Sequence, residues 1–298
     1  MSGSAATAAP ERQAVLRSEA SAVRRRRIGK AISYSVLVAI AVVYIFPFVI
    51  AIVTAFKTEP DATANPLSLV PSPATTSAFH QLYKDQDFLV WVKNSVIVTL
   101  SVTFLRVFLD SLAGYALARL RFRGRGAAFA TIVAVMAVPS VVLLIPKFLM
   151  IRQLGIYDTY YGMIVPLLVD AAGVFIMKNF FESIPVSVEE SARIDGASIF
   201  RTYWSIVLPM ARPALVTIFI LSFQGSWNEL AHFIIAAQST SLDTLTKGVA
   251  QLASGELGVG NRYPLKLAAS VLMTIPVAIL FFVFQRRIMN ASAGAVKE

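Results

Sequence analysis

Residues 187–209 read SVEESARIDGASIFRTYWSIVLP, a polar and amphipathic segment between two long apolar runs. Ser187 followed three residues later by Glu190 is a capping-box pattern, which predicts that a helix begins at Ser187. Gly196 suits the left-handed position that closes a short helix. The segment therefore predicts one short helix that ends just before Gly196.

A second short helix is predicted to carry Ile199, Phe200, Tyr203 and Trp204. Pro209 would mark the start of the next apolar run, because proline is tolerated mainly in the first turn of a helix. Two short helices with apolar and charged residues side by side indicate a docking element.

The composition points to a membrane protein. Of the 298 residues 56% are hydrophobic and 15% are charged, with a mean hydropathy of +0.67, whereas soluble domains carry about 25% charged residues. The net charge is +10, but the arginines sit in short runs beside apolar segments. That is the positive-inside pattern of membrane proteins and not a nucleic-acid surface. The absence of cysteine excludes disulfides.

Six apolar runs are each long enough for about 30 Å of hydrocarbon, and we expect an all-α integral membrane protein. The spans are predicted at about residues 31–56, 92–118, 127–150, 160–181, 208–237 and 264–284. Arginines cluster before the first span, after the second, around residues 187–209 and after the sixth. The positive-inside rule places all four clusters in the cytoplasm, together with both termini. Residues 1–27 are predicted to be a disordered cytoplasmic tail and residues 28–298 one six-helix domain.

Charged groups inside the spans need a reason, since each costs about 2.5–3.5 kcal/mol at the bilayer centre. Arg106 and Asp110 lie four residues apart and share a helix face. They form either an internal ion pair or part of a translocation pathway. Asp170, in the fourth span, has no such partner nearby in the sequence.

A polar cluster in the fifth span comprises Gln224, Trp227, Asn228 and Glu229. Hydrogen-bonding groups beside an aromatic ring suit a polar uncharged ligand such as a sugar. Equally, such groups join helices to one another as packing contacts. No Walker A loop, HExxH motif or Ser-His-Asp grouping is present. The chain is therefore not expected to be an enzyme, and the energy for any driven work would come from a partner.

The segment 187–209 resembles the EAA motif of ATP-binding-cassette importer permeases. The family pattern is Glu-Ala-Ala, three residues, Gly, nine residues, Ile-x-Leu-Pro. Here it reads Glu190-Ser191-Ala192, Gly196 and Ile206-Val207-Leu208-Pro209, with Ser191 as the sole departure. Residues 225–229, 268–272 and 293–297, with Pro276, are similar to the carbohydrate branch, in particular the maltose-type second permease subunit.

The resemblance implies a complex with a second permease subunit, two copies of a cassette ATPase that binds ATP and Mg, and an extracytoplasmic solute-binding protein. The chain itself would hold no cofactor, bind no nucleic acid and lie in a bacterial-type cytoplasmic membrane. Residues 250–261 would reach the binding protein and residues 293–298 would lie near the ATPase. The residues implied to couple to the ATPase are Glu190, Ser191, Ala192, Arg193, Ile194, Asp195, Gly196, Ile199, Phe200, Ile206, Leu208 and Pro209.

Two other classes of function remain open from the residues. A stand-alone secondary transporter would couple ions through Asp110, Asp170 and Glu229, and a membrane-bound enzyme would need a site that no motif provides. The solute is open among disaccharides, trehalose, oligosaccharides and glycerol-phosphate compounds. Whether this subunit contacts the solute directly is open as well.

Overall fold

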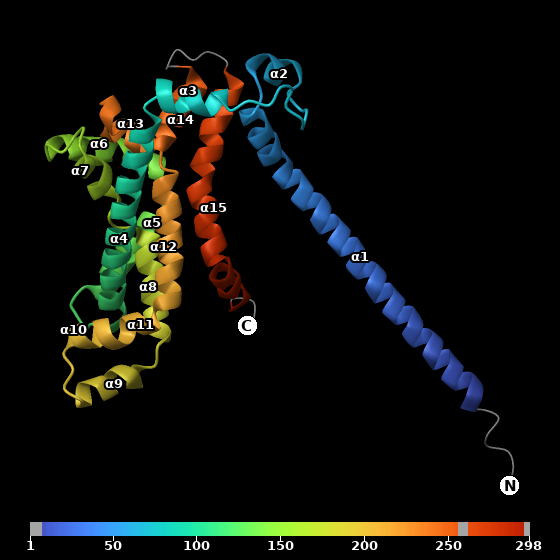
Figure 1. Cartoon of the computed structure of the whole chain (residues 1–298). Coiled ribbons are helices and arrows are strands. Elements are labelled where there is room, and N and C mark those ends of the chain that lie inside the picture. The colour runs from blue at the N-terminus through green and yellow to red at the C-terminus, as the bar shows by residue number, and fades with distance from the viewer. Residues whose placement is uncertain (1–7, 256–261, 295–298) are drawn as a thin grey trace, which may run out of the picture.

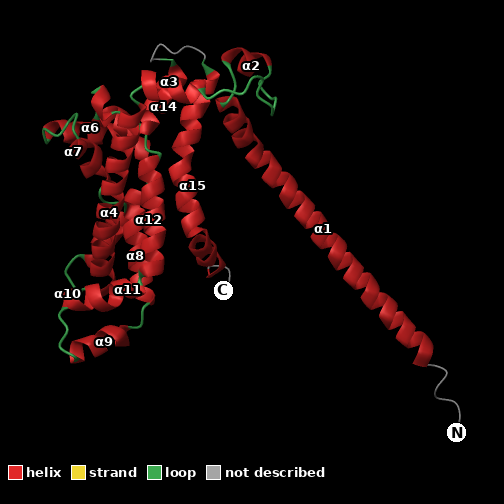
Figure 2. Cartoon of the chain, viewed as in Figure 1, coloured by secondary structure: helices red, strands yellow, loops and turns green. Residues whose placement is uncertain are grey.

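The structure of the chain, a computed structural model, describes residues 8–255 and 262–294. Every regular element in these two ranges is a helix (Figure 2), which confirms the predicted all-α class. Most helices form one bundle, from which the long helix α1 stands apart (Figure 1).

Helix α1 runs from Ala8 to Ala55 and continues through Pro47. Residues 8–27 are therefore helical and not a disordered tail, while residues 1–7 lie outside the described residues. Ala, Glu and Arg, which favour helix, are frequent in that stretch. The part from Arg26 to Ala55 is apolar enough to cross a membrane, and its most apolar stretch buries nothing against the rest of the chain.

Helix α4 (Phe88–Arg119) is the central helix of the bundle and packs against α8 (Ala171–Ser183) and α12 (Arg212–Trp227). A Cβ on Gly114 of α4 would lie 2.6 Å from the Cβ of Met177 in α8. In lipid, apolar surface alone does not drive helices together, so close contact between helix backbones matters more. Small residues such as glycine allow that close contact. Helix α15 (Tyr263–Gly294) packs against α12 and against α1.

Three of the predicted spans are broken. Helix α5 (Arg125–Met136) is followed by a 3₁₀ turn at Ser140–Leu143 and by α6 (Leu144–Gln153), with a bend of 104°. Pro139 lies at this break, where a proline interrupts the helical hydrogen bonds.

Helix α7 (Tyr160–Ile164) and the 3₁₀ turn Val165–Leu167 meet α8 at 42°. The stretch Ile199–Met210 meets α12 at 79°. Among the described residues three helices are thus long and apolar enough to cross a membrane, or up to six spans if each bent pair counts as one.

The two ends of the bundle differ (Figure 1). One end, here called the α3 end, carries α2 (Glu59–Ala64), α3 (Ser77–Asp85), α13 (Ala231–Ala236), a 3₁₀ turn at Thr240–Leu242 and α14 (Leu245–Ser254). The predicted fifth span thus ends at Trp227, because α13 is a separate short helix. Residues 256–261, in the loop expected to reach a binding protein, lie outside the described residues.

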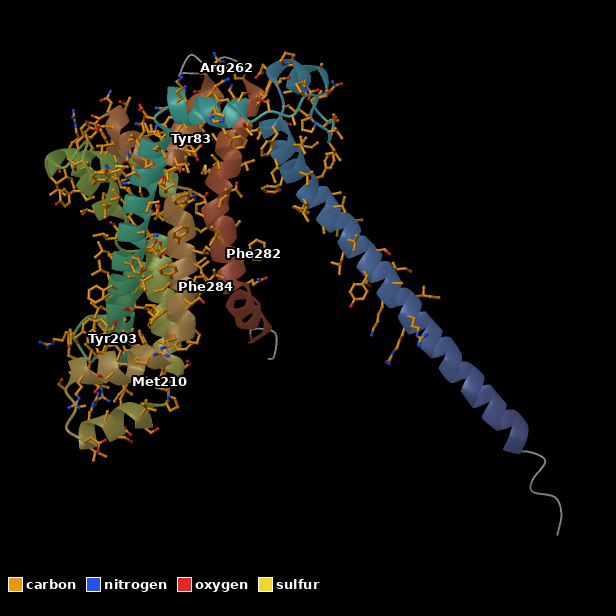
Figure 3. All side chains as sticks on the ribbon, viewed as in Figure 1. Tyr83, Tyr203, Met210, Arg262, Phe282 and Phe284 are labelled. Atoms are coloured by element: carbon orange, nitrogen blue, oxygen red, sulfur yellow. The ribbon has the colours of Figure 1, made fainter. Side chains whose placement is uncertain are left out.

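The opposite end, the α9 end, carries α9 (Val186–Ile194), α10 (Ile199–Thr202), a π-helical turn at Tyr203–Val207 and α11 (Leu208–Met210). We call residues 186–210 the α9–α11 segment. It rests on a core cluster that includes Tyr115, Phe181, Tyr203 and Ile218. Tyr203 of this segment lies next to α4, where its hydroxyl meets Ser111 Oγ (Figure 3).

Candidate functional site

Helix α9 begins one residue before the predicted Ser187, and the predicted capping box is wrong. Pro185 occupies the N-cap position with φ −57° and ψ 133°, and no side chain caps the helix. Ser187 thus lies inside the first turn, where its hydroxyl does not reach the N–H groups that a capping box would bind. Its carbonyl instead accepts a hydrogen bond from Ser191 Oγ at 2.9 Å.

The end of α9 follows the prediction for Gly196. This residue has φ 76°, in the left-handed region. Its N–H donates to the carbonyl of Arg193, and the N–H of Ala197 donates to the carbonyl of Ala192 at 2.9 Å. These two bonds form a Schellman motif, in which glycine avoids the cost of a Cβ at positive φ. The sharp turn between α9 and α10 therefore depends on Gly196.

The second predicted helix also forms. Ser198 caps α10 by accepting the N–H of Arg201 at 3.3 Å. The helix continues as the π-helical turn that contains Ile206, and then as α11 with Leu208 and Pro209. Ile206 and Leu208 are half-buried, next to fully buried Val207. The apolar end of the motif thus anchors the α9–α11 segment in the bundle.

The outer face of this segment is apolar and exposed. Ile194 is 87% exposed, Phe200 65% and Ile199 54%. Glu190, Ser191, Arg193 and Asp195 are also exposed around them, whereas Ala192 is buried. An apolar patch rimmed by charges on a polar end of the molecule is typical of a protein-binding surface. Most of the residues predicted to bind a partner on α9 and α10 are therefore available to one, whereas Ala192 is not.

The inner face of α9 carries a residue that the sequence reasoning missed. Glu189, and not Glu190, is the buried glutamate, and its Oε1 lies 3.0 Å from Nε of Arg119. Its Oε2 accepts a hydrogen bond from the hydroxyl of Tyr115 at 3.3 Å. No sequence signal separates the two adjacent glutamates, because which one faces inward depends on how α9 rotates about its axis.

The four residues of the predicted solute cluster point in different directions. Trp227 is buried, stacks on Phe223 at 5.7 Å and donates from Nε1 to the carbonyl of Met273 at 3.1 Å. Glu229 accepts the N–H of His232 at 2.9 Å. Gln224 and Asn228 are instead exposed. The structure therefore separates Trp227 from the two amides.

A hollow of about 200 Å³ opens beside those amides. It is lined by Arg106, Asp170, Gly173, Ile218, Leu221, Ser222 and Gly225. Leu221 and Gly225 share an exposed face of α12 with Gln224 and Asn228, since residues three and four apart lie together on a helix. Together, the hollow and this face of α12 offer the Arg106 guanidinium, the Asp170 carboxylate and two amides beside apolar side chains. Such a mixture suits a polar organic ligand.

Arg106 and Asp110 do not form the internal ion pair that was one of the two alternatives for them. Arg106 donates from Nε to the carbonyl of Leu167 at 2.7 Å, and Asp110 accepts the N–H of Asp170 at 3.1 Å. Asp170 in turn caps α8 by accepting the N–H of Gly173 at 3.0 Å. These bonds tie α4 to the break between α7 and α8. In the described part of the chain no three His, Asp or Glu side chains are grouped so that they could hold a metal ion.

Comparison with known proteins shows the family. The family described as binding-protein-dependent transport system inner membrane component matches residues 110–291, more than half of the chain. The sulfoquinovosyl glycerol transport system permease protein SmoH of Agrobacterium fabrum is 34% identical, over 85% of this chain and 89% of its own. The diacetylchitobiose uptake system permease protein NgcG of Streptomyces coelicolor is 32% identical, over 90% of this chain and 87% of its own.

A solved structure agrees with this result. The crystal structure of a bacterial ABC transporter that imports the acidic polysaccharide alginate contains a chain that is 26% identical, with a TM-score of 0.77. The match covers 88% of this chain and 97% of that one. The chain described here therefore belongs to the inner-membrane components of binding-protein-dependent transport systems, a family of transport permeases.

Proposed function

We propose that the chain is one permease subunit of an ATP-driven importer for a saccharide or a saccharide-like solute, and that a cassette ATPase docks on the α9–α11 segment. The observation that carries the proposal is the exposed apolar patch of Ile194, Ile199 and Phe200 on a segment with the EAA spacing. ATP and Mg would then be bound by the ATPase and not by this chain.

The direction of the chain in the membrane follows from its arginines. The loop between α4 and α5, which contains Arg121 and Arg123, lies at the α9 end (Figure 1), and the α9–α11 segment itself contains Arg193 and Arg201. By the positive-inside rule this end faces the cytoplasm. The N-terminal end of α1 and the C-terminal end of α15 point the same way (Figure 1). Both termini are therefore proposed to be cytoplasmic, with each bent helix pair counted as one of six spans.

The second permease subunit is proposed to lie against α1. This helix diverges from the bundle, and a groove of about 390 Å³ opens between α1 and α15, lined by residues such as Pro47, Ala51, Val271 and Ile275. An apolar groove between two helices gives a neighbouring membrane helix a surface to pack against. The α3 end would then face the solute-binding protein. In a related structure the alginate transporter is in complex with a periplasmic protein.

The solute is proposed to be a saccharide because the named relatives transport a sulfoquinovosyl glycerol and diacetylchitobiose, and the solved relative imports alginate. Gln224, Asn228 and the hollow beside Arg106 supply hydrogen-bonding groups for hydroxyls. Trp227 is removed from the proposed contacts because its ring and its N–H are both occupied.

An independent ion-coupled transporter is not favoured. Asp110, Asp170 and Glu229 would have to exchange ions in that mechanism. Each of them instead accepts a backbone N–H. Ion coupling would also leave the exposed α9–α11 segment without a role.

Substitution of Gly196 tests the docking site. Gly196→Val places a β-branched residue at φ 76° and should break the turn between α9 and α10. Gly196→Asn is the matched control, because asparagine tolerates the left-handed region. We expect the co-expressed ATPase to co-purify with the wild-type chain and with Gly196→Asn, and about tenfold less with Gly196→Val. Equal recovery of the ATPase with all three chains would refute the docking site.

A further inference from the structure

Helix α9 is joined to the bundle through very few side chains. Its buried residues are Glu189 and Ala192, and Ala192 has only a methyl group to offer. The other residues of the helix are exposed, apart from half-buried Val188. Glu189 is therefore the one long polar side chain through which α9 is attached to the bundle.

Glu189 is held by the end of α4. Its Oε1 lies 3.0 Å from Arg119 Nε, with side-chain exposures of 3% and 9%; the contact is an ion pair and not an aligned hydrogen bond. Tyr115 donates from its hydroxyl to the other oxygen at 3.3 Å. The Arg193 guanidinium, which is largely exposed, is 4.0 Å away. The pair is therefore sequestered from water and bound on both carboxylate oxygens.

Arg119 also joins a third element. Its guanidinium donates to the carbonyls of Phe181 and Ile184 at the end of α8. The guanidinium is planar and rigid, and its N–H donors point in fixed directions. A buried guanidinium therefore holds the segments that it contacts in a fixed arrangement. The end of α4, the end of α8 and α9 thus meet at one side chain.

The contact extends along α4 as a stripe. Ser111, Tyr115 and Arg119 follow one another at intervals of four residues, so they share one face of the helix. Ser111 Oγ is 2.7 Å from the hydroxyl of Tyr203 in the π-helical turn. The rings of Tyr115 and Tyr203 are 5.0 Å apart. The stripe therefore contacts the α9–α11 segment at two places, at Glu189 in α9 and at Tyr203 just after α10.

We propose that Ser111, Tyr115 and Arg119 bind Glu189 and Tyr203 so that the α9–α11 segment and α4 move as one rigid body, and that Glu189 is the positioning residue of this joint. Movement of α9 would then be carried along α4 to Arg106, which lines the hollow. The inference rests on the proposed function, since it takes the ATPase as the source of the movement.

The chain contains no cysteine, so two introduced cysteines can carry spin labels without background. Labels at exposed Leu105 of α4 and exposed Ser191 of α9 report the distance across the joint. In the purified full chain we expect one narrow distance distribution, and a distribution about twofold wider in Glu189→Gln, because the variant leaves Arg119 buried without its counter-charge. Glu182→Gln is the matched control, since Glu182 pairs with Lys178 and Arg125 at the exposed surface.

The assembled transporter gives the second measurement. A rigid joint predicts that the distance between positions 105 and 191 stays constant when a non-hydrolysable ATP analogue binds the ATPase, and that it changes in Glu189→Gln. Tyr115→Phe removes only the hydroxyl and keeps the ring contacts with Phe181 and Tyr203, so it tests the joint if Glu189→Gln folds poorly. It should give the same broadening to a smaller extent.

Two results would overturn the inference. One is a distribution in Glu189→Gln and Tyr115→Phe as narrow as in the wild type. The other is a wild-type distance that changes when the analogue binds. Failure of the ATPase to co-purify with the wild-type chain would instead count against the proposed function. The distances in the purified chain would still decide whether the joint is rigid.

Discussion

Helices α1 and α4 are both long, apolar and able to cross a membrane, yet they are placed very differently. The most apolar stretch of α1 buries none of its residues, whereas 33% of the corresponding stretch of α4 is buried. α1 is the more apolar of the two. Hydropathy therefore does not predict which helix lies in the centre of a membrane bundle.

Polar and small residues explain the difference. Asn94 of α4 donates to the carbonyls of Ser241 and Asp243 at 2.9 and 2.8 Å, and Ser95 accepts the N–H of Leu245 at 2.7 Å. In lipid, where apolar surface alone does not drive helices together, such bonds and close packing join them. Over residues 26–55, where the side chains of α1 are described, the helix makes no comparable hydrogen bond to the bundle, which leaves this surface for lipid or for a second subunit.

The largest effect is expected where α4 packs closely against α14. A Cβ on Gly248 of α14 would lie 2.2 Å from Cδ2 of Trp91 in α4, a ring that is buried against Phe88. Gly248→Ala should destabilise the chain by about 3 kcal/mol or prevent its accumulation, because the core cannot take the extra volume. Gly29→Ala on α1 meets nothing within 4 Å and should be neutral or slightly stabilising.

Thermal unfolding in detergent, with the amount of folded chain measured by size-exclusion chromatography, distinguishes these two variants. Equal melting temperatures for Gly248→Ala and Gly29→Ala would contradict the contrast between α4 and α1.

An intermediate effect is expected on α1, and only in the complex. Ala51 lines the groove between α1 and α15. Ala51→Trp should leave the melting temperature of the isolated chain unchanged, because the groove is open. It should weaken association with the second permease subunit by about tenfold, or about 1.4 kcal/mol. Association is measured by co-purification at a series of protein concentrations. If pairing is unaffected, α1 faces lipid at this position.

The smallest effect is expected from pH at the α3 end, where α1 joins the bundle. The N–H of Ser72 donates to the Asp61 carboxylate at 2.9 Å, and this bond, with smaller contributions from Asn65 and Lys57, lowers the pKa of Asp61. Bonds from the Ser239 hydroxyl and N–H, and from the N–H of Gln238, lower the pKa of Asp158.

A carboxylate whose folded pKa is lowered stabilises the fold fully above its unfolded pKa of about 3.9. That stabilisation is lost as the pH falls through the lower folded pKa. We expect the melting temperature of the wild type to fall between pH 6 and pH 3, and to fall less in Asp61→Asn, which is already less stable at pH 6. Parallel pH profiles for the two chains would show that Asp61 does not contribute.

The local structure of the α9–α11 segment was largely predictable because it depends on residues close together in the sequence. The turn at Gly196 depends on a single φ angle, and the second helix depends on Ser198 and on the apolar residues that follow it. The capping box failed for a local reason too, since Pro185 starts the helix before Ser187. The break in the third span could not be predicted from hydropathy, because the apolar run continues through the 104° bend.

The polar cluster of the fifth span shows where prediction from sequence ends. Its four residues are neighbours in the chain, but Trp227 faces Phe223 and Met273 while Gln224 and Asn228 face outward. The hollow beside them combines Arg106 and Asp170 with Gly225, residues from three separate helices. Such a combination appears only when the helices have been placed against one another.

The sequence by itself determined the membrane class and the motif that ends at Pro209, because composition and spacing are properties of the chain alone. Tertiary structure decided which of two adjacent glutamates is buried. Packing fixes the rotation of α9 so that Glu189 meets Arg119, and Glu190 is left at the surface. Rotation about a helix axis is set by what the helix packs against, and the packing partners of α9 lie some 70 residues away in the sequence, on α4.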